Sequence, residues 1–412
     1  MPPEAAPRAA RAAPRKPGSR KVASPHERAL RTLLADCRRL ISERGDAGDP
    51  RIAQALVAQI DGLADEPRRR FFEHLARDFG PDPQQVLACA QAFAEAPDQA
   101  EHLIRLTQAA EPPRQELFRR LNRAPGGTAA LVRLRRSLLE RLPRQRGLAG
   151  VEHDLHHLLS SWFNPGFLQM RKVDWTSPAQ LLEQIIRHEA VHAIDGWDDL
   201  RRRLQPDRRC FAFFHPQLPD EPLIFVEVAL VPEMAAAIAP LIDKKSQPLP
   251  PEDFQVAVFY SISNCQPGLR GVSLGNFLIK RVAEQLKREL PQLKTFCTLS
   301  PIPGFMDWLQ RMHGDAEAAV MAASPSEVLR MAARFLVHES VRPQGDPVAR
   351  FHLDNGARLE RLNPQANLSA KGLKQSAGLM VNYLYDLARI ETCHDRFVQG
   401  RVVHSRAVAA LL

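Results

Sequence analysis

The chain has 412 residues, which is too many for one ordinary hydrophobic core and predicts two domains. Hydrophobic residues make up 44% and charged residues 25% of the chain, and the lack of a long apolar run excludes a membrane-spanning helix. The net charge of +9 favours an anionic partner, which is nucleic acid, an acidic membrane surface or a polyphosphate ligand such as coenzyme A.

The N-terminus and the cysteines indicate where the chain resides. Residues 1–25 are rich in Ala, Pro, Arg and Lys and have no apolar segment, which excludes a secretory signal and predicts a disordered basic tail. An Arg-rich transit peptide is the alternative, although the prolines weaken it. Six scattered cysteines without a CxxC pair exclude a disulfide scaffold and a cysteine-rich zinc site. We therefore expect a reducing compartment, the cytoplasm.

Residues 26–164 predict an all-α helical bundle. In the first segment, Leu30, Leu33, Leu34 and Leu40 recur at the spacing of one helix face. Similar segments follow, and Gly and Pro residues that end helices separate them.

Residues 165–412 predict a mixed α/β domain. The stretch over 210–231 fits two strands joined by a Pro/Asp turn, and residues 254–265 form a continuous β-rich run. A helix is expected over 275–290, followed by a short strand over 293–299. The fold class is therefore α+β, with a helical bundle ahead of a mixed α/β domain.

The letters HEAVH, from His188 to His192, spell the HExxH zinc motif. A helix over 179–194 would place both histidines on one face, as a zinc hydrolase needs. The extended zinc-protease pattern has Gly three residues after the second His and a ligand six residues after it. Here Asp195 and Asp198 occupy those positions, so a variant site stays open beside a purely structural role for both histidines.

A glycine-bearing loop lies between the predicted strand over 254–265 and the next helix. Glycines let backbone N–H groups approach a phosphate closely, and a helix N-terminus adds positive potential. The loop resembles the pyrophosphate loop of the GNAT acyl-CoA fold, and a tight turn without a ligand is the alternative. The candidate ligand-binding residues are Gln266, Gly268, Leu269, Arg270, Gly271, Ser273 and Gly275. Lys280 and Arg281 are further candidates for phosphate contacts.

Several long blocks in series resemble the malonyl-CoA decarboxylase family. They are YSISNCQPGLRGVSLGNFLIKRV, LSPIPGFMDWL, ARFHLDNGARLERLN and SAGLMVNYLYDL, and the resemblance covers roughly residues 155–390. It implies a GNAT-fold catalytic domain that converts malonyl-CoA to acetyl-CoA and CO2 without a metal or organic cofactor, the coenzyme A moiety belonging to the substrate. It also implies a homodimer or tetramer assembled through the helical domain, and no nucleic-acid or membrane partner.

The resemblance also implies the catalytic residues. Ser300 would hydrogen-bond the malonyl carboxylate, His352 would protonate the α-carbon, and Tyr385 would orient His352. From the local pattern alone, His352 belongs to a strand-like run and Tyr385 to a helix. Ser273 stands where animal members carry a glutamate, so either its hydroxyl substitutes for that carboxylate or the carboxylate is dispensable.

Three alternative functions remain at this stage. A GNAT-type acyltransferase would share the fold but require an acceptor. A helical nucleic-acid-binding module would use the basic surface, yet no DNA-binding motif is recognisable. A zinc hydrolase conflicts with the family, in which the position matching His188 need not be His.

Overall fold

The computed structural model describes residues 25–42, 50–272, 274 and 278–412. The predicted tail therefore lies outside the described residues except for Pro25, and Ser273 and Gly275 lie outside them as well. The chain divides into two compact units, residues 1–125 and 126–412. The change from helices to strands falls near residue 165, and the two helices ahead of it group with the sheet.

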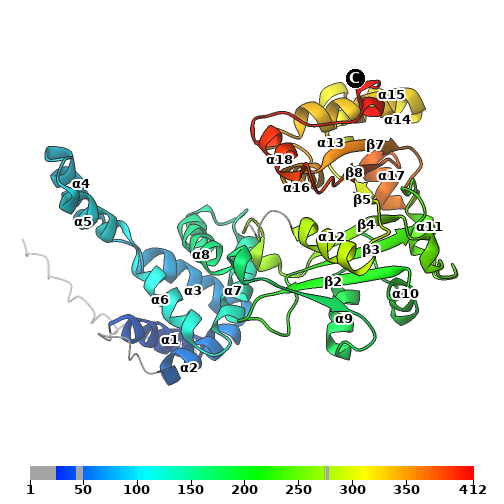
Figure 1. Cartoon of the computed structure of the whole chain (residues 1–412). Coiled ribbons are helices and arrows are strands. Elements are labelled where there is room, and N and C mark those ends of the chain that lie inside the picture. The colour runs from blue at the N-terminus through cyan, green and yellow to red at the C-terminus, as the bar shows by residue number, and fades with distance from the viewer. Residues whose placement is uncertain (1–24, 43–49, 273, 275–277) are drawn as a thin grey trace, which may run out of the picture. The chain divides into compact units, whose positions relative to one another are not determined.

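The first unit is helical, in agreement with the apolar periodicity. Its core contains the buried side chains of Leu33, Phe71, Phe72, Leu117 and Phe118. The α4–α5 pair extends away from the other helices of this unit (Figure 1). The helices are α1 (Pro25–Ser42), α2 (Pro50–Asp61), α3 (Asp65–Arg77), α4 (Pro83–Glu95), α5 (Ala100–Ala110) and α6 (Pro113–Arg123).

The second unit contains one mixed sheet that joins all the named strands of the described residues. The order is β1-β2-β3-β4-β5-β8-β6, with β7 paired to β8, and only β4 and β5 run parallel. The strands are β1 (Gln169–Val173), β2 (Arg208–Phe214), β3 (Ile224–Val231), β4 (Val256–Asn264), β5 (Thr295–Thr298), β6 (Ser300–Pro301), β7 (Arg358–Asn363) and β8 (Met380–Leu384).

Helices cover both faces of this sheet, which explains why β3 is buried along its whole length. Helix α12 (Leu278–Glu289) packs on the face that carries Phe213, Val226 and Phe259. Helices α9 (Ala179–His188), α10 (Trp197–Arg203) and α11 (Ala239–Ile242) pack on the opposite face. The expected α+β class, a helical bundle followed by a mixed α/β domain, is confirmed.

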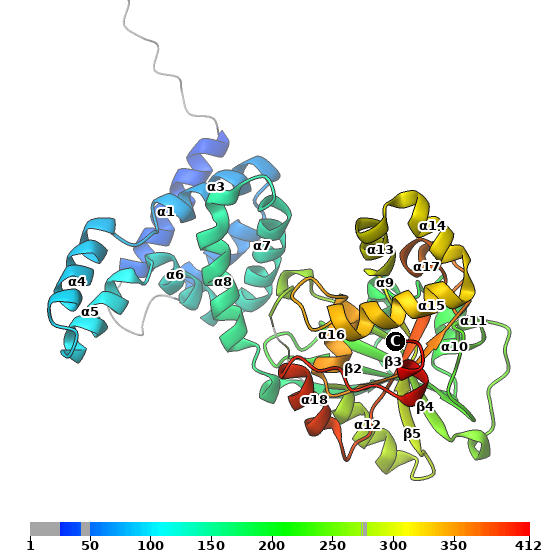
Figure 2. The same ribbon diagram turned by 90° about the horizontal axis from the view of Figure 1, so that it is seen from above.

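Among the remaining helices, α13, α14, α15 and α17 are grouped together (Figure 2). Within the described ranges, no helix combines the length and apolarity needed to cross a membrane. The remaining helices are α7 (Gly127–Arg141), α8 (Ala149–Trp162), α13 (Phe305–His313), α14 (Asp315–Ala323), α15 (Pro325–Arg334), α16 (Pro347–Asp354), α17 (Ala370–Ser376), α18 (Ile390–Val398) and α19 (Arg406–Ala409).

Candidate active site

The site begins where β4 and β5 separate. The two strands pair over Val256–Phe259 of β4, and the backbone N–H of Leu299 donates the last connecting bond to the Phe259 carbonyl at 3.0 Å. Beyond it, β4 continues to Asn264 alongside β3, whereas the chain after β5 turns to pair with β8. The sheet therefore opens, and one edge of β4 has no strand beside it.

A serine–histidine pair lies at this opening. Ser300 is on β6 and His352 is on α16, and Ser300 Oγ lies 3.0 Å from His352 Nε2. The opposite ring nitrogen, Nδ1, lies 2.9 Å from the hydroxyl of Tyr385. All three side chains are buried. The structure thus brings the three predicted catalytic residues together, and we call Ser300 and His352 the dyad.

Hydrogen-bond directions assign the imidazole tautomer. Ser300 Oγ donates to Thr298 Oγ1 at 2.9 Å, so Ser300 accepts the Nε2–H of His352. Nδ1 then accepts from the Tyr385 hydroxyl, and every member of the chain has a partner. The sequence-based prediction missed Thr298, which lies two residues before Ser300 at the end of β5.

Burial makes His352 neutral in the free protein. Loss of solvation lowers its pKa from 6.5 to about 3, because the charged imidazolium is the form that burial disfavours. The same cause raises the pKa of the Tyr385 hydroxyl. The Tyr383 ring stacks on the imidazole with 4.7 Å between centroids, which fixes the plane of the ring.

The secondary structure around two of these residues differs from the sequence-based expectation. His352 lies in the second turn of α16 rather than in a strand, and Tyr385 directly follows strand β8 rather than lying on a helix. Both predictions were wrong because the segments are short, and an apolar run of this length fits either a strand or a buried helix.

The dyad lines a cavity of about 290 Å³, which we call the smaller cavity. Most of its wall is apolar and comes from β4, α16 and the segment after α9. A larger cavity of about 580 Å³ adjoins it, since both are lined by Ile224, Asn264 and Phe351. The larger cavity is lined by Gln266, Leu269, Arg270 and Gly271 of the predicted phosphate loop, together with Arg136 of α7.

Helix α7 backs the phosphate loop. A Cβ on Gly268 would lie 2.0 Å from the Val132 carbonyl oxygen, so the missing side chain permits close contact with the helix. Arg135 reinforces this contact by donating to the Gly268 carbonyl at 2.7 Å. Gly271 adopts a φ of +82°, which favours glycine. The backbone therefore explains two glycines of the loop: Gly268 by its close contact with α7, and Gly271 by its positive φ.

The other predicted phosphate contacts have protein partners. The Gln266 amide donates to Glu221 and to the Pro222 carbonyl. Lys280 pairs with Glu391 at 3.2 Å, and Arg281 donates to the Leu168 carbonyl. Arg270 and Arg136 are the cations that line the larger cavity within the described residues.

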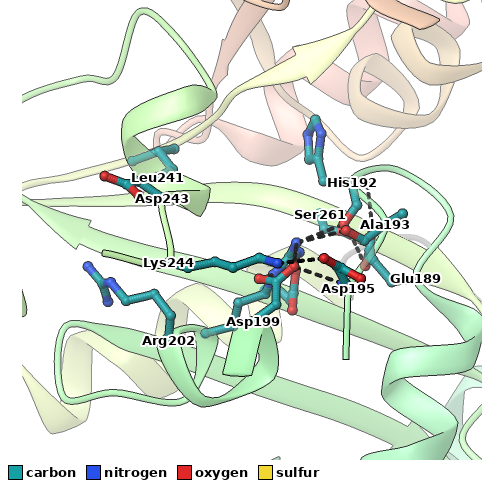
Figure 3. Close-up of polar contacts among 12 residues, drawn as sticks. Glu189, His192, Ala193, Asp195, Asp199, Arg202, Leu241, Asp243, Lys244 and Ser261 are labelled. Atoms are coloured by element: carbon teal, nitrogen blue, oxygen red, sulfur yellow. Dashed lines mark hydrogen bonds and ion pairs between the residues drawn. The ribbon is translucent and has the colours of Figure 1, made fainter. Parts of the chain in front are cut away.

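The HExxH letters do not form a helical zinc motif. Helix α9 ends at His188, because Glu189 has extended backbone angles of φ −64° and ψ 109°. The Glu189 carboxylate accepts from the backbone N–H groups of Val191 and His192, each at 2.8 Å. It also accepts from Ser261 at 2.6 Å (Figure 3). A further bond comes from Ser263 at 3.1 Å.

Buried charges hold the rest of this segment. Arg203 donates to the His192 carbonyl at 2.9 Å and pairs with Asp199 and Glu227. Within the described residues, no cluster of three His, Cys, Asp or Glu side chains has the arrangement of a metal site. The expected helix over 179–194 is therefore wrong, and the zinc-hydrolase alternative loses the geometry on which it depended.

Comparisons with known proteins agree on one family. The malonyl-CoA decarboxylase C-terminal domain model matches residues 166–341 and 320–412, and the N-terminal domain model matches residues 79–163. The mitochondrial malonyl-CoA decarboxylase of Mus musculus is 37% identical over 391 residues, covering 80% of this chain and 79% of that protein. The corresponding protein of Anser anser anser is 36% identical over 372 residues, covering 76% and 73%.

Solved structures give the same result. The crystal structure of malonyl-CoA decarboxylase from Rhodopseudomonas palustris has a TM-score of 0.86 at 47% identity and covers 92% of this chain and 99% of that one. The one from Agrobacterium vitis has a TM-score of 0.84 at 46% identity with the same coverage. The fold and these matches define an enzyme of the carboxy-lyase class. The chain belongs to the malonyl-CoA decarboxylase family, as the sequence blocks predict.

The contact between Gly268 and α7 leads to a testable prediction. Gly268→Ala would force the loop away from Val132, so we expect a lower melting temperature and a KM for the coenzyme A thioester raised about tenfold. Thermal melting and steady-state kinetics measure both. Gly147→Ala is the matched control, since a Cβ there meets nothing within 4 Å. Wild-type values in Gly268→Ala would contradict the close contact.

Proposed function

We propose that this chain converts malonyl-CoA to acetyl-CoA and CO2 and needs no metal or organic cofactor. The observation that carries the proposal is the 3.0 Å contact between Ser300 and His352 in a buried cavity. That cavity adjoins a second one lined by a glycine-bearing loop and arginines. In a member of the malonyl-CoA decarboxylase family, this arrangement suits an acyl group tethered to a polyphosphate.

The proposed reaction breaks the bond between the α-carbon and the carboxylate of the malonyl group. The electron pair of that bond moves into the thioester carbonyl and gives an enolate, and CO2 leaves. On substrate binding, the Ser300 hydroxyl would turn its hydrogen from Thr298 to the carboxylate. This bond would hold the carboxylate out of the carbonyl plane, where the breaking bond overlaps the carbonyl π system. A neutral hydroxyl suits this role, because an arginine would stabilise the charged ground state more than the transition state.

A proton must then reach the α-carbon, and we assign its delivery to His352. The free imidazole is neutral, and a neutral imidazole is a poor acid. When the malonyl carboxylate enters the same dry cavity, its negative charge favours the imidazolium and raises the pKa of His352. His352 would take up a proton with the substrate and pass it to the α-carbon, while Tyr385 holds Nδ1.

The carboxylate that animal members carry at the position of Ser273 has no counterpart in this proposal. Ser273 lies outside the described residues, and its hydroxyl or a water would substitute for the glutamate if assistance is needed. The chain of Thr298, Ser300, His352 and Tyr385 supplies orientation without a carboxylate.

The dyad assignment predicts the effect of removing either member. Ser300→Ala and His352→Ala should each lower kcat for malonyl-CoA by roughly 10²-fold or more, while the protein stays folded at the assay temperature. Release of CO2 and acetyl-CoA is measured with EDTA present and no acyl acceptor. His153→Ala, an exposed histidine on α8, is the control and should keep wild-type kinetics.

Two outcomes would count against these assignments. Near-wild-type rates in both dyad variants would remove Ser300 and His352 from the mechanism. Turnover only with an added acyl acceptor would favour the GNAT-type acyltransferase, and inhibition by EDTA would point to a metal.

The buried, neutral His352 predicts that substrate binding takes up protons. Between the free pKa of about 3 and the higher pKa of the complex, the complex holds a proton that the free protein lacks, so affinity falls as pH rises. Calorimetry of a non-decarboxylating malonyl-CoA analogue near pH 6, in buffers of different ionisation enthalpy, measures this uptake. His352→Gln should lose it, which separates it from titration of the ligand phosphates. Equal uptake in both proteins would contradict the role of His352.

We also propose that the chain forms a homo-oligomer through its helical unit. Helices α4 and α5 contain no buried side chain, and Leu87, Leu103 and Ile104 are 60%, 49% and 53% exposed. Large apolar side chains gathered on an exposed helix pair are typical of protein interfaces. The cytoplasmic location expected from the cysteines stays a prediction, and the animal relatives named above are mitochondrial.

The oligomer proposal predicts a change of mass on charging this surface. Leu103→Glu and Ile104→Glu together should lower the molar mass in light scattering, because they would place carboxylates in an apolar interface. Gln91→Glu, at an exposed position of α4, is the matched control. An unchanged mass in the double variant would move the interface elsewhere.

A further inference from the structure

A buried carboxylate joins the two segments that carry the dyad. Asp346 is 1% exposed and precedes α16. Its Oδ1 accepts from the backbone N–H groups of Val348 at 3.0 Å and Ala349 at 2.9 Å, which is the usual way to cap a helix N-terminus. Its Oδ2 accepts from the backbone N–H of Gly304 at 2.9 Å. Gly304 belongs to a different segment, the loop between Ser300 and α13.

The second bond exceeds what a helix cap requires. One oxygen satisfies the free N–H groups of the first turn, so a helix cap does not need the other oxygen. Asp82 at α4 is such a case, because its Oδ1 accepts both helix bonds and it lies on the surface. In Asp346, the second oxygen instead binds a loop that follows Ser300 by four residues.

Burying this carboxylate has a cost. Within the described residues Asp346 forms no ion pair, and its partners are the backbone N–H groups of Gly304, Val348 and Ala349. Loss of solvation raises the pKa of its carboxyl group, against the hydrogen bonds that lower it. Burying a carboxylate without a cation costs free energy that capping a helix of eight residues does not require. Its second contact therefore calls for a functional reason.

The position of the contact supplies that reason. Gly304 follows Ser300 closely, and His352 lies six residues after Asp346, roughly 9 Å along the helix axis at the usual rise. Strand β8 holds Ser300 from one side through its pairing with Val381. On the other side of Ser300, the hydrogen bond between Asp346 and Gly304 links the loop after Ser300 to the start of α16. One carboxylate therefore sets the spacing between the segments that carry Ser300 and His352.

We propose that Asp346 is a positioning residue for decarboxylation, and that its Oδ2 bond to Gly304 maintains the hydrogen bond between Ser300 and His352. The inference rests on the function proposed for the dyad. Asp346 acts through these two side chains and does not line either cavity. A displacement of about 1 Å between catalytic groups can cost about 10²-fold in rate, which makes such a link important.

Asp346→Asn separates the two functions of the carboxylate. The Asn oxygen can still accept from Val348 and Ala349, whereas its NH2 group would face the Gly304 N–H and lose that bond. We expect a melting temperature close to wild type, a kcat lowered at least tenfold and a KM within about twofold of wild type. Asp346→Ala removes the cap as well and should also lower the melting temperature. Asp82→Asn, at the exposed cap of α4, is the matched control.

Two further measurements distinguish positioning from general damage. In a Ser300→Ala background, Asp346→Asn should cause little further loss of kcat, because the group it positions is already gone. The proposal would be overturned if the two substitutions lowered kcat by independent factors that multiply, or if Asp346→Asn kept a wild-type kcat. A crystal structure of Asp346→Asn tests the proposal without measuring activity, so its result holds even if malonyl-CoA is not the substrate. We expect the distance between Ser300 Oγ and His352 Nε2 to exceed 3.5 Å. An unchanged distance of 3.0 Å would overturn the proposal.

Discussion

The separation of β4 from β5 is the constraint on which the site depends. Parallel pairing ends at the bond between Leu299 and Phe259, and the chain after β5 turns to pair with β8. The turn places Ser300 across an opening from β4 and leaves the β4 edge exposed to a cavity instead of to another strand. The wall of this cavity is largely apolar, so an acyl group that entered it would lose part of its contact with water.

The apolar surroundings of the dyad have opposite effects on the two charged groups of the proposed reaction, the substrate carboxylate and the protonated His352. A carboxylate in an apolar cavity is poorly solvated, and its charge spreads as CO2 leaves, so a dry site favours the transition state. The same dryness makes the free His352 neutral. In the mechanism proposed above, the carboxylate of the substrate would provide the stabilisation that the imidazolium lacks in the empty site. The buried histidine would then act as an acid without a neighbouring carboxylate from the protein.

The sequence predicts much of the fold because local patterns determine it. Apolar periodicity locates the helices of the first unit, and continuous β-rich runs locate β2, β3 and β4. Ser300, His352 and Tyr385 could be selected only through the family blocks, since their spacing along the chain shows no common surface. The helix start at Asp346-Pro347 was missed, although Asp is a preferred N-cap and Pro suits the first helical position.

Contacts between distant segments account for what the sequence could not predict. Helix α9 ends at His188 because Glu189 binds two serines of β4, which no local pattern contains. The sequence pattern predicted that Gly268 contacts a phosphate, whereas its close neighbour in the structure is the Val132 carbonyl of α7. For the same reason α7 groups with the sheet although its own sequence fits the helical bundle. In each case the deciding partner lies more than 70 residues away along the chain.

We propose that the dyad and the glycine-bearing loop bind the two ends of one substrate. A crystal structure with a malonyl-CoA analogue that cannot lose CO2 would locate both ends. We expect the diphosphate against the backbone of residues 266–271 and the malonyl carboxylate within hydrogen-bonding distance of Ser300 Oγ. An acyl group bound outside the smaller cavity, with its carboxylate away from both Ser300 and His352, would show that the dyad does not bind the malonyl group.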